Sequence, residues 1–292
     1  MATHRGLSED ETCRTFVLPA LDRAGWSNDQ IRPQYRINEG KLVATSQYHA
    51  RSEPLIVDYV LEYGPDLPIG VVEAKRTRAN AADGIEQAKR YAQRLDLPFA
   101  YATNGRVIYE IDLVGGRQAE VDRFPSPDEL WARHLTHNGI DTQLGEELLR
   151  APYDRSLPRN WDNSVTRPRY YQRLAVNRTI SAIAKGEKRI LLTLATGTGK
   201  TMVAFQIVAK LRQSGWIQGR KPRVLYLADR NILIDQPKDE YFYPAFGCTS
   251  SAKVRLREVG SLSRAVPVAR QWGRGTAVPA IRADVLRSGD RR

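Results

Sequence analysis

The seven residues Ala195 to Thr201, which read Ala-Thr-Gly-Thr-Gly-Lys-Thr, have the composition of a loop that binds nucleotide phosphates. Glycines allow successive backbone N–H groups to point at the phosphates, and the helix that follows adds its partial positive charge. In such a loop the lysine reaches the phosphates and the last hydroxyl binds the accompanying Mg²⁺. The sequence therefore predicts an ATP site formed by Thr196, Gly197, Thr198, Gly199, Lys200 and Thr201, with Thr201 as a metal ligand.

The segments around this loop have the required order. An apolar run at 190–194 predicts a strand, helical spacing continues through 202–211, and a second apolar run at 223–228 predicts another strand. Strand, helix and strand form a βαβ unit of an α/β nucleotide-binding domain. Leu194 stands where the full phosphate-loop pattern has glycine, which favours the helicase variant over small GTPases and kinases.

A second set of chemical groups lies nearer the N-terminus, at Asp58 and in the tripeptide Glu73-Ala-Lys75. Glu73 and Lys75 point to the same face of an extended strand. Asp58 lies among apolar residues, where a charge is costly unless it is paired or binds a metal. Pairing of the two strands would place Asp58 beside Glu73, and two carboxylates suit Mg²⁺. The pattern predicts a Mg²⁺-dependent nuclease centre with Asp58 and Glu73 as metal ligands and Lys75 as a catalytic group.

Gln87 and Tyr91 follow on a predicted helix at a spacing of four, so they share a face and could reach the same centre. The simpler alternative is a Glu–Lys cross-strand pair on a solvated sheet edge, with Tyr91 packed in a helix core.

The elements that must position these residues follow from periodicity and turn chemistry. Ser8 with Glu11 forms a predicted capping box that opens a helix ending before Gly25. The sequence predicts helices at 7–24, 80–95, 126–134 and 169–184, and strands at 42–44, 55–63, 67–75, 98–103 and 106–112. Asn104-Gly105 predicts a hairpin turn. The proline-rich segment 151–168 is interpreted as a linker between two domains.

Composition describes a globular protein. The chain has 292 residues, of which 41% are apolar, and no apolar run is long enough to span a membrane. We therefore expect a cytoplasmic location. Two cysteines, Cys13 and Cys248, are too few and too distant for a disulfide framework or a zinc site. The net charge of +12 is concentrated after residue 248 and is weak evidence for nucleic-acid binding.

The segment 249–292 differs from the rest of the chain. It is rich in arginine, and neither a strand nor a helix period is sustained. Two interpretations are open: a basic disordered tail that binds DNA, or the frameshifted end of a longer gene, of which we favour the second.

Taken in order, these motifs resemble the restriction (R, or motor) subunit of type I restriction–modification enzymes. The resemblance rests on Asp58, Glu73-Ala-Lys75 and Gln87-x-x-x-Tyr91, with the phosphate loop after them. It extends to Glu11, to Arg169-Tyr-Tyr-Gln172 and to the segment 227–236.

The resemblance implies an α/β chain with a restriction-endonuclease-like nuclease domain at 1–150, a linker at 151–168, a partial RecA-like helicase domain at 169–248 and the tail. It implies that Glu11 belongs to the nuclease centre, that Gln172 contacts the adenine of ATP, and that Arg230 and Gln236 touch the DNA backbone. The implied cofactors are ATP and Mg²⁺. The implied partners are double-stranded DNA and the specificity and methyltransferase subunits, with no membrane.

The implied function is ATP-dependent DNA translocation coupled to endonucleolytic cleavage of foreign DNA, in a truncated chain. The family's second carboxylate motif and second RecA-like domain are not found here, so we expect no productive ATP hydrolysis. Two alternatives stay open. One is an inert fragment that only binds DNA, ATP or partner subunits, and the other is a stand-alone Mg²⁺-dependent nuclease with a vestigial ATP site.

Overall fold

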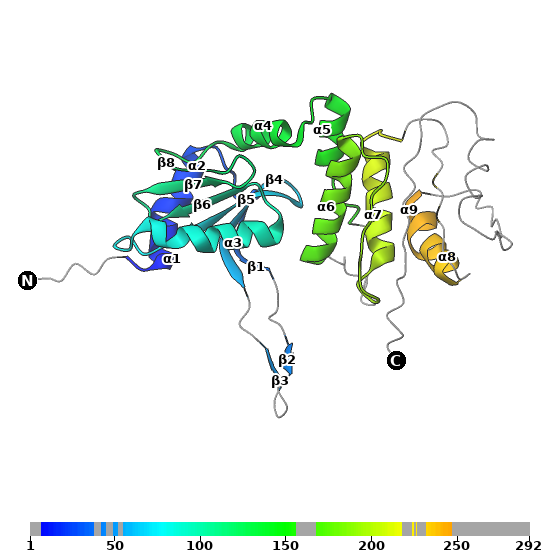
Figure 1. Ribbon diagram of the computed structural model, residues 1–292, viewed down its shortest axis with the longest axis horizontal. Coiled ribbons are helices and arrows are strands. Elements are labelled where there is room, and N and C mark those ends of the chain that lie inside the picture. Colours follow the sequence, from blue (N-terminus) through cyan, green and yellow to red (C-terminus); the bar gives the residue numbers. More distant parts are fainter. Residues whose placement is uncertain are drawn as a thin grey trace, which may run out of the picture.

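The computed structural model describes residues 7–37, 42–44, 49–51, 55–155, 168–217, 224, 226 and 232–246. Its centre is a six-stranded mixed sheet with the order β1-β4-β5-β6-β7-β8, and a separate hairpin is formed by β2 and β3 (Figure 1). The strands are β1 Ile31–Arg36, β2 Leu42–Ala44, β3 His49–Arg51, β4 Ile56–Gly64, β5 Leu67–Ala74, β6 Phe99–Thr103, β7 Ile108–Asp112 and β8 Arg117–Val121.

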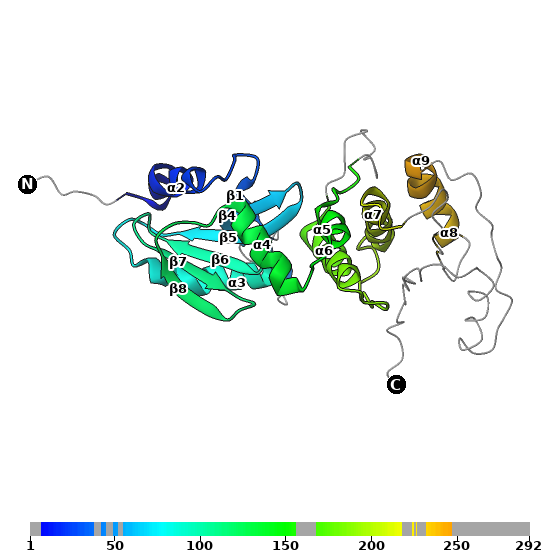
Figure 2. The ribbon, with the colours of Figure 1, turned by 90° about the horizontal axis from the view of Figure 1, so that it is seen from above.

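The helices lie on both faces of this sheet and beyond its end (Figures 1 and 2). They are α1 Glu9–Thr12, α2 Leu18–Arg23, α3 Ile85–Leu95, α4 Pro127–Asn138, α5 Gln143–Arg150, α6 Tyr170–Ala184, α7 Lys200–Gln213, α8 Ile232–Pro237 and α9 Tyr243–Phe246. A π-helical turn at Cys13–Val17 joins α1 to α2, a 3-10 turn at Ala81–Gly84 precedes α3, and a π-helical turn at Lys238–Phe242 joins α8 to α9.

The predicted hairpin of two buried strands is confirmed. β4 and β5 pair antiparallel, and the ladder begins with Tyr59 opposite Val72, which leaves Asp58 and Glu73 as the next residues along the two strands. β5 and β6 run parallel, which requires a crossover, and α3 supplies it. The predicted hairpin at Asn104-Gly105 is also present, since β6 pairs antiparallel with β7.

Two apolar layers hold the sheet between its helices. One layer packs α3 against the sheet through small residues such as Ala88, Ala92, Ala100 and Ala102, which let the helix approach closely. The other layer covers the opposite face with the N-terminal helices and α4, around Tyr101 and Phe99. Glu73 lies on the face under α3, because it alternates with Val72 and Ala74 of the other layer.

The second layer does not stop at the sheet. It continues through Leu148 and Leu149 of α5 into the buried faces of α6 and α7, so one core runs through both parts of the chain. α5, α6 and α7 stand side by side at the end of the sheet (Figure 1). The start of the predicted linker is part of this core, because Ala151 and Tyr153 are buried. The domain boundaries stay predictions.

One predicted element is wrong. Residues 190–194 form no strand, although Ile190, Leu192 and Leu194 pack on the core while Leu191 is 71% exposed, as in a strand. A strand needs a neighbour for its backbone hydrogen bonds, and no described residue pairs with this segment. The predicted strand 223–228 lies mostly outside the described residues, as does the segment 249–292. None of the helices in the described part of the chain combines the length and hydrophobicity that a membrane span requires.

Candidate active site

The candidate nuclease centre lies where β4 and β5 pass under α3. The backbone N–H of Ala74 donates to Asp58 Oδ2 at 2.8 Å, which ties the first carboxylate to the strand that carries the second. Lys75 Nζ donates to Glu73 Oε1 at 3.0 Å and to Gln87 Oε1 at 2.9 Å. The structure therefore brings Asp58, Glu73, Lys75 and Gln87 together, as their spacing predicts.

Tyr91 belongs to the same hydrogen-bonded chain, since Gln87 Nε2 donates to the Tyr91 hydroxyl at 3.0 Å. Gln87 thus accepts from the lysine through its oxygen and donates to the tyrosine through its nitrogen, which fixes the orientation of its amide. Tyr91 is only 5% exposed, so this hydroxyl is held in one place. The solvated-edge alternative does not describe this cluster, because Glu73 is only 4% exposed.

The electrostatics of the centre follow from two carboxylates close together in a buried place. Burial, and then the charge of Asp58, raise the pKa of Glu73 to about 7. Burial also raises the pKa of Asp58, although the Ala74 N–H opposes this. Burial alone would lower the pKa of Lys75, but the hydrogen bond and charge of Glu73 outweigh it and raise that pKa. A cation beside the carboxylates would relieve this unfavourable energy.

The donors present fit a magnesium ion. Glu73 Oε2 is buried and has no hydrogen-bond partner among the described residues, so one carboxylate oxygen is left for a ligand. Mg²⁺ is commonly held by one or two carboxylates and keeps several waters. Among the described residues, no group of three or more acidic, histidine or cysteine side chains is placed to hold a metal.

Glu11 does not join this cluster. Its carboxylate accepts from the Ser8 backbone at 2.8 Å and from the Ser8 hydroxyl at 2.9 Å, so the predicted capping box is confirmed. The acidic residue of this helix whose charge acts on Asp58, Glu73 and Lys75 is Glu9. Sequence reasoning missed it, although its place at the start of the same helix was a signal.

Gln34 is a second residue that the sequence did not indicate. Its side-chain Nε2 lies 3.4 Å from Asp58 Oδ1, and its backbone has a φ of +48°, in the left-handed region. Such a conformation is uncommon for a residue other than glycine, and it turns the side chain of an edge strand toward the centre.

The phosphate loop, residues 195–201, runs into the start of α7. Lys200 Nζ donates to the carbonyls of Leu194 at 3.0 Å and Ala195 at 3.2 Å, and the Thr198 hydroxyl donates to Ala195 O at 2.6 Å. Gly197 and Gly199 have φ values of +79° and +82°, which only glycine adopts readily. Thr196 lies in the same turn, and Thr201 lies at the start of α7.

Gln172 of α6 contacts this loop directly, because its Nε2 donates to Thr198 O at 2.8 Å. The residue is buried, so it is not a surface helix residue. Of the two residues implied for DNA contact, Gln236 is on α8, exposed, and donates to Glu240 at 3.1 Å. Arg230 lies outside the described residues.

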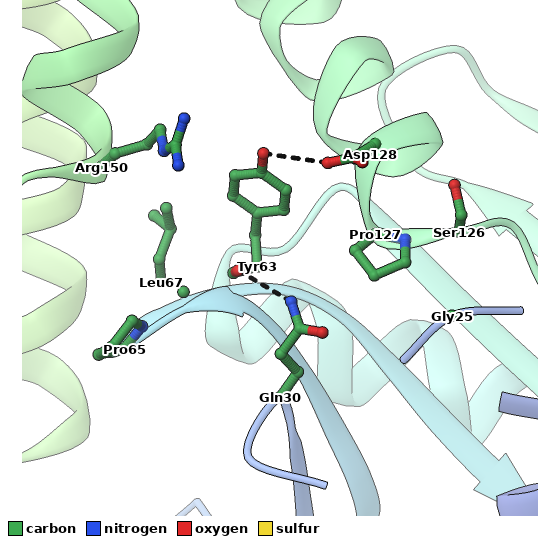
Figure 3. A pocket seen from close by; sticks show the side chains of 10 residues that line it. Gly25, Gln30, Tyr63, Pro65, Leu67, Ser126, Pro127, Asp128 and Arg150 are labelled. Atoms are coloured by element: carbon green, nitrogen blue, oxygen red, sulfur yellow. Dashed lines mark hydrogen bonds between the residues drawn. The ribbon is translucent and has the colours of Figure 1, made fainter. Parts of the chain in front are cut away.

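A cavity of about 470 Å³ lies apart from both sites, at the turn end of the β4–β5 hairpin (Figure 3). Tyr63 forms one wall, with its hydroxyl donating to Asp128 at 3.2 Å, and Arg150 of α5 lies across from it. Tyr63 also stacks on Trp131 at 4.4 Å between ring centroids. The ring is thus held in place by packing within the fold.

Two regions of the chain are similar to known restriction enzymes. Residues 166–261 match the family described as type III restriction enzyme, res subunit, and residues 28–97 match the second domain of the type I restriction enzyme EcoKI endonuclease subunit. A fragment assigned to the HsdR subunit of a type I restriction enzyme from Vibrio vulnificus superimposes with a TM-score of 0.66 and 40% identity, over 75% of this chain and 40% of that one.

Two curated relatives agree with these matches. The type I restriction enzyme EcoAI endonuclease subunit of Escherichia coli is 38% identical over 87% of this chain. The EcoKI endonuclease subunit of Escherichia coli K12 is 28% identical over 79% of it. The chain spans only 30% and 23% of these two relatives. The family that the motifs indicate is thereby confirmed: the chain is homologous to the N-terminal region of the endonuclease (R) subunit of type I restriction enzymes.

Proposed function

We propose that this chain carries the DNA-cleaving centre and the nucleotide loop of a type I restriction enzyme R subunit. In this proposal, residues 1–150 form a restriction-endonuclease-like nuclease domain and residues 169–248 form part of a RecA-like domain. The observation that supports it most is the cluster of half-buried Asp58, buried Glu73 and half-buried Lys75, in which Glu73 Oε2 has no partner among the described residues.

Each residue of the cluster has a task in cleavage of a phosphodiester. Asp58, fixed by the Ala74 N–H, and Glu73, fixed by Lys75, present oxygens for Mg²⁺. When bound, this ion would polarise the scissile phosphate and lower the pKa of its water. Lys75 is held by Gln87 so that its ammonium can stabilise charge that develops on the phosphate.

The phosphate loop supplies the proposed ATP site, with Gln172 placed to contact the adenine and Thr201 to bind Mg²⁺. Its support is the Gln172 hydrogen bond to Thr198 O and the two glycines at positive φ. The partners proposed for the whole protein are double-stranded DNA and the specificity and methyltransferase subunits. An isolated Mg²⁺-dependent nuclease with a vestigial ATP site is the second candidate, and the intact carboxylate cluster favours it over an inert fragment.

The test is nicking of supercoiled plasmid in Mg²⁺ by the purified chain and by Asp58→Ala and Lys75→Ala. We expect both changes to abolish nicking while the thermal midpoint stays near that of the parent. Glu120→Ala, on the exposed edge strand β8, serves as the acidic control. Equal nicking by the parent and Asp58→Ala would contradict the proposal.

A further inference from the structure

Arg173 of α6 joins the helix beside the nucleotide loop to the sheet that carries the nuclease centre. Its guanidinium donates to the Tyr35 hydroxyl on β1, and its carbon lies 5.3 Å from the centroid of the Tyr35 ring. It also lies 3.7 Å from Glu62 and 3.6 Å from Asp66, at the far end of β4. One side chain thus contacts β4, the strand that carries Asp58, and β1, the strand that pairs with it.

The burial of Arg173 makes these contacts obligatory. Its side chain is 12% exposed, and Glu62 is 3% exposed. Burial lowers the pKa of Arg173 to about 10, so the guanidinium is still charged at neutral pH. A buried charge is costly unless it is paired and hydrogen-bonded, which restricts Arg173 to the position that satisfies these partners.

Tyr35 stands directly beside the residues that form the centre. It pairs with Val57, the residue before Asp58, and it follows Gln34, whose amide faces the Asp58 carboxylate. A left-handed backbone is unfavourable at a residue such as Gln34, because its Cβ comes too close to the following carbonyl oxygen. Such a backbone conformation persists where the surrounding structure holds it. Tyr35, the residue after Gln34, is held by its hydrogen bond from Arg173.

We propose that Arg173 is a positioning residue for the nuclease centre: by anchoring Tyr35 and the end of β4 it holds Gln34 against Asp58 and so orients this carboxylate for its metal. The inference rests on the proposed function of Asp58. It also gives α6 two roles, because the preceding residue, Gln172, contacts the phosphate loop.

The experiment measures Mn²⁺ binding, by the electron paramagnetic resonance signal of the free ion, in the parent, Tyr35→Phe, Arg173→Met and Asp58→Ala. The part of the binding that Asp58→Ala removes reports on this centre alone. We expect Tyr35→Phe and Arg173→Met each to weaken that part roughly 10-fold, as loss of outer contacts to a metal ligand commonly does. The double variant should be no weaker than Arg173→Met, because both changes break the same contact.

Arg178→Met is the matched control. Arg178 is on the same helix, and its ion pair is with Asp96 at the C-terminal end of α3, at 2.6 Å, rather than with a residue of β1 or β4. It should leave Mn²⁺ affinity within about twofold of the parent. The Mg²⁺ concentration that gives half-maximal nicking should rise in Tyr35→Phe and in Arg173→Met, and it should stay near the parent value in Arg178→Met.

Unchanged Mn²⁺ affinity and unchanged Mg²⁺ dependence in Tyr35→Phe would overturn the inference while leaving the proposed function intact. Tyr35→Phe removes only a hydroxyl, so this result is available even if Arg173→Met destabilises the chain by leaving Glu62 with Arg32 as its remaining ion-pair partner. A parent without any Asp58-dependent Mn²⁺ binding would contradict both the inference and the proposed function.

Discussion

Gln206 forms two hydrogen bonds with the backbone of Asp154, one in each direction. The Asp154 N–H donates to Gln206 Oε1 at 2.9 Å, and Gln206 Nε2 donates to Asp154 O at 2.8 Å. The side-chain amide thus forms the same pair of hydrogen bonds that the backbone of a neighbouring strand would form. Gln206 is 1% exposed, so the pair fastens α7, the helix after the phosphate loop, to the segment that follows α5.

Gln206→Leu should lower the free energy of unfolding by about 1–3 kcal/mol, because it removes two hydrogen bonds of about 0.5–1.5 kcal/mol each. Urea unfolding followed by circular dichroism measures the change. Gln213→Leu, at the exposed end of the same helix, is the control and should stay within about 0.5 kcal/mol of the parent. Equal stability of the two variants would show that the paired amide adds nothing.

Gly199→Ala should impair nucleotide binding more than Gly197→Ala. Both glycines have positive φ, so either alanine is strained. A Cβ at Gly199 would also meet Gln172 Nε2 at 2.5 Å, whereas one at Gly197 meets nothing within 4 Å. Fluorescent ATP-analogue binding tests this order. Equal losses would mean that the contact of Gln172 with the loop is not needed for binding.

Tyr91→Phe should reduce Mg²⁺-dependent nicking about 5-fold, since it removes a hydrogen bond of about 1 kcal/mol, one of the two that orient the Gln87 amide. Gln87→Leu should cost more, because it also removes a partner of Lys75. Initial nicking rates at saturating Mg²⁺ give the comparison. Tyr243→Phe, at a residue that is 56% exposed, should match the parent. A larger loss in Tyr91→Phe than in Gln87→Leu would reverse the proposed order of the contacts.

Stability should rise with pH above about 8 because of Lys210. Its ammonium donates to the carbonyls of Leu149 and Ala151, and burial lowers its pKa from 10.5 to about 8. Between these two values the unfolded chain binds more protons than the folded chain at this site, so stability increases as pH rises. Below pH 8 both states are protonated and the cost of burying the charge is fully present.

The measurement is the thermal midpoint of the parent and Lys210→Met from pH 7.5 to 9.5. We expect the thermal midpoint of the parent to rise relative to that of Lys210→Met as pH rises. Taking the difference between the two proteins removes the contribution of the titrating groups that they share. Lys188→Met, on the exposed turn after α6, should leave the pH dependence of the parent unchanged. A difference that is constant over this range would contradict the lowered pKa.

The buried half of the fold could be predicted from the sequence because its signals are local. β4 and β5 are apolar runs on either side of a turn, and they were expected within one residue of their observed bounds. Asp58 meets Glu73 as a consequence of that hairpin alone. Gln87 and Tyr91 meet Lys75 because a helix fixes their common face.

The edge strands could not be predicted in this way. β1 contains Pro33 and is mostly exposed, and β8 is exposed along most of its length. An edge strand has one neighbour and little apolar surface to bury, so its sequence lacks an alternating pattern. Gln34 was missed for the same reason, since it lies on β1 and its left-handed conformation is set by tertiary contacts.

Two further differences have separate causes. The place of Glu9 at the start of the first helix was a local signal, but that its charge acts on the candidate centre depends on how this helix packs on the sheet. At 190–194 the alternation of a strand is present, but secondary structure of this kind depends on a partner, and the described residues supply none.

The continuous core through α5, α6 and α7 has a consequence for how such proteins can be recombined. A crossover at residue 150 between two relatives would join an α5 from one parent to an α6 and α7 from the other, and unmatched apolar surfaces would meet at Leu148 and Leu149. A crossover between α4 and α5 would transfer the three helices together. Viable natural or engineered chimaeras should therefore inherit α5 together with α6 and α7, and they should keep Trp131 of α4, whose indole donates to Glu146 of α5 at 2.8 Å.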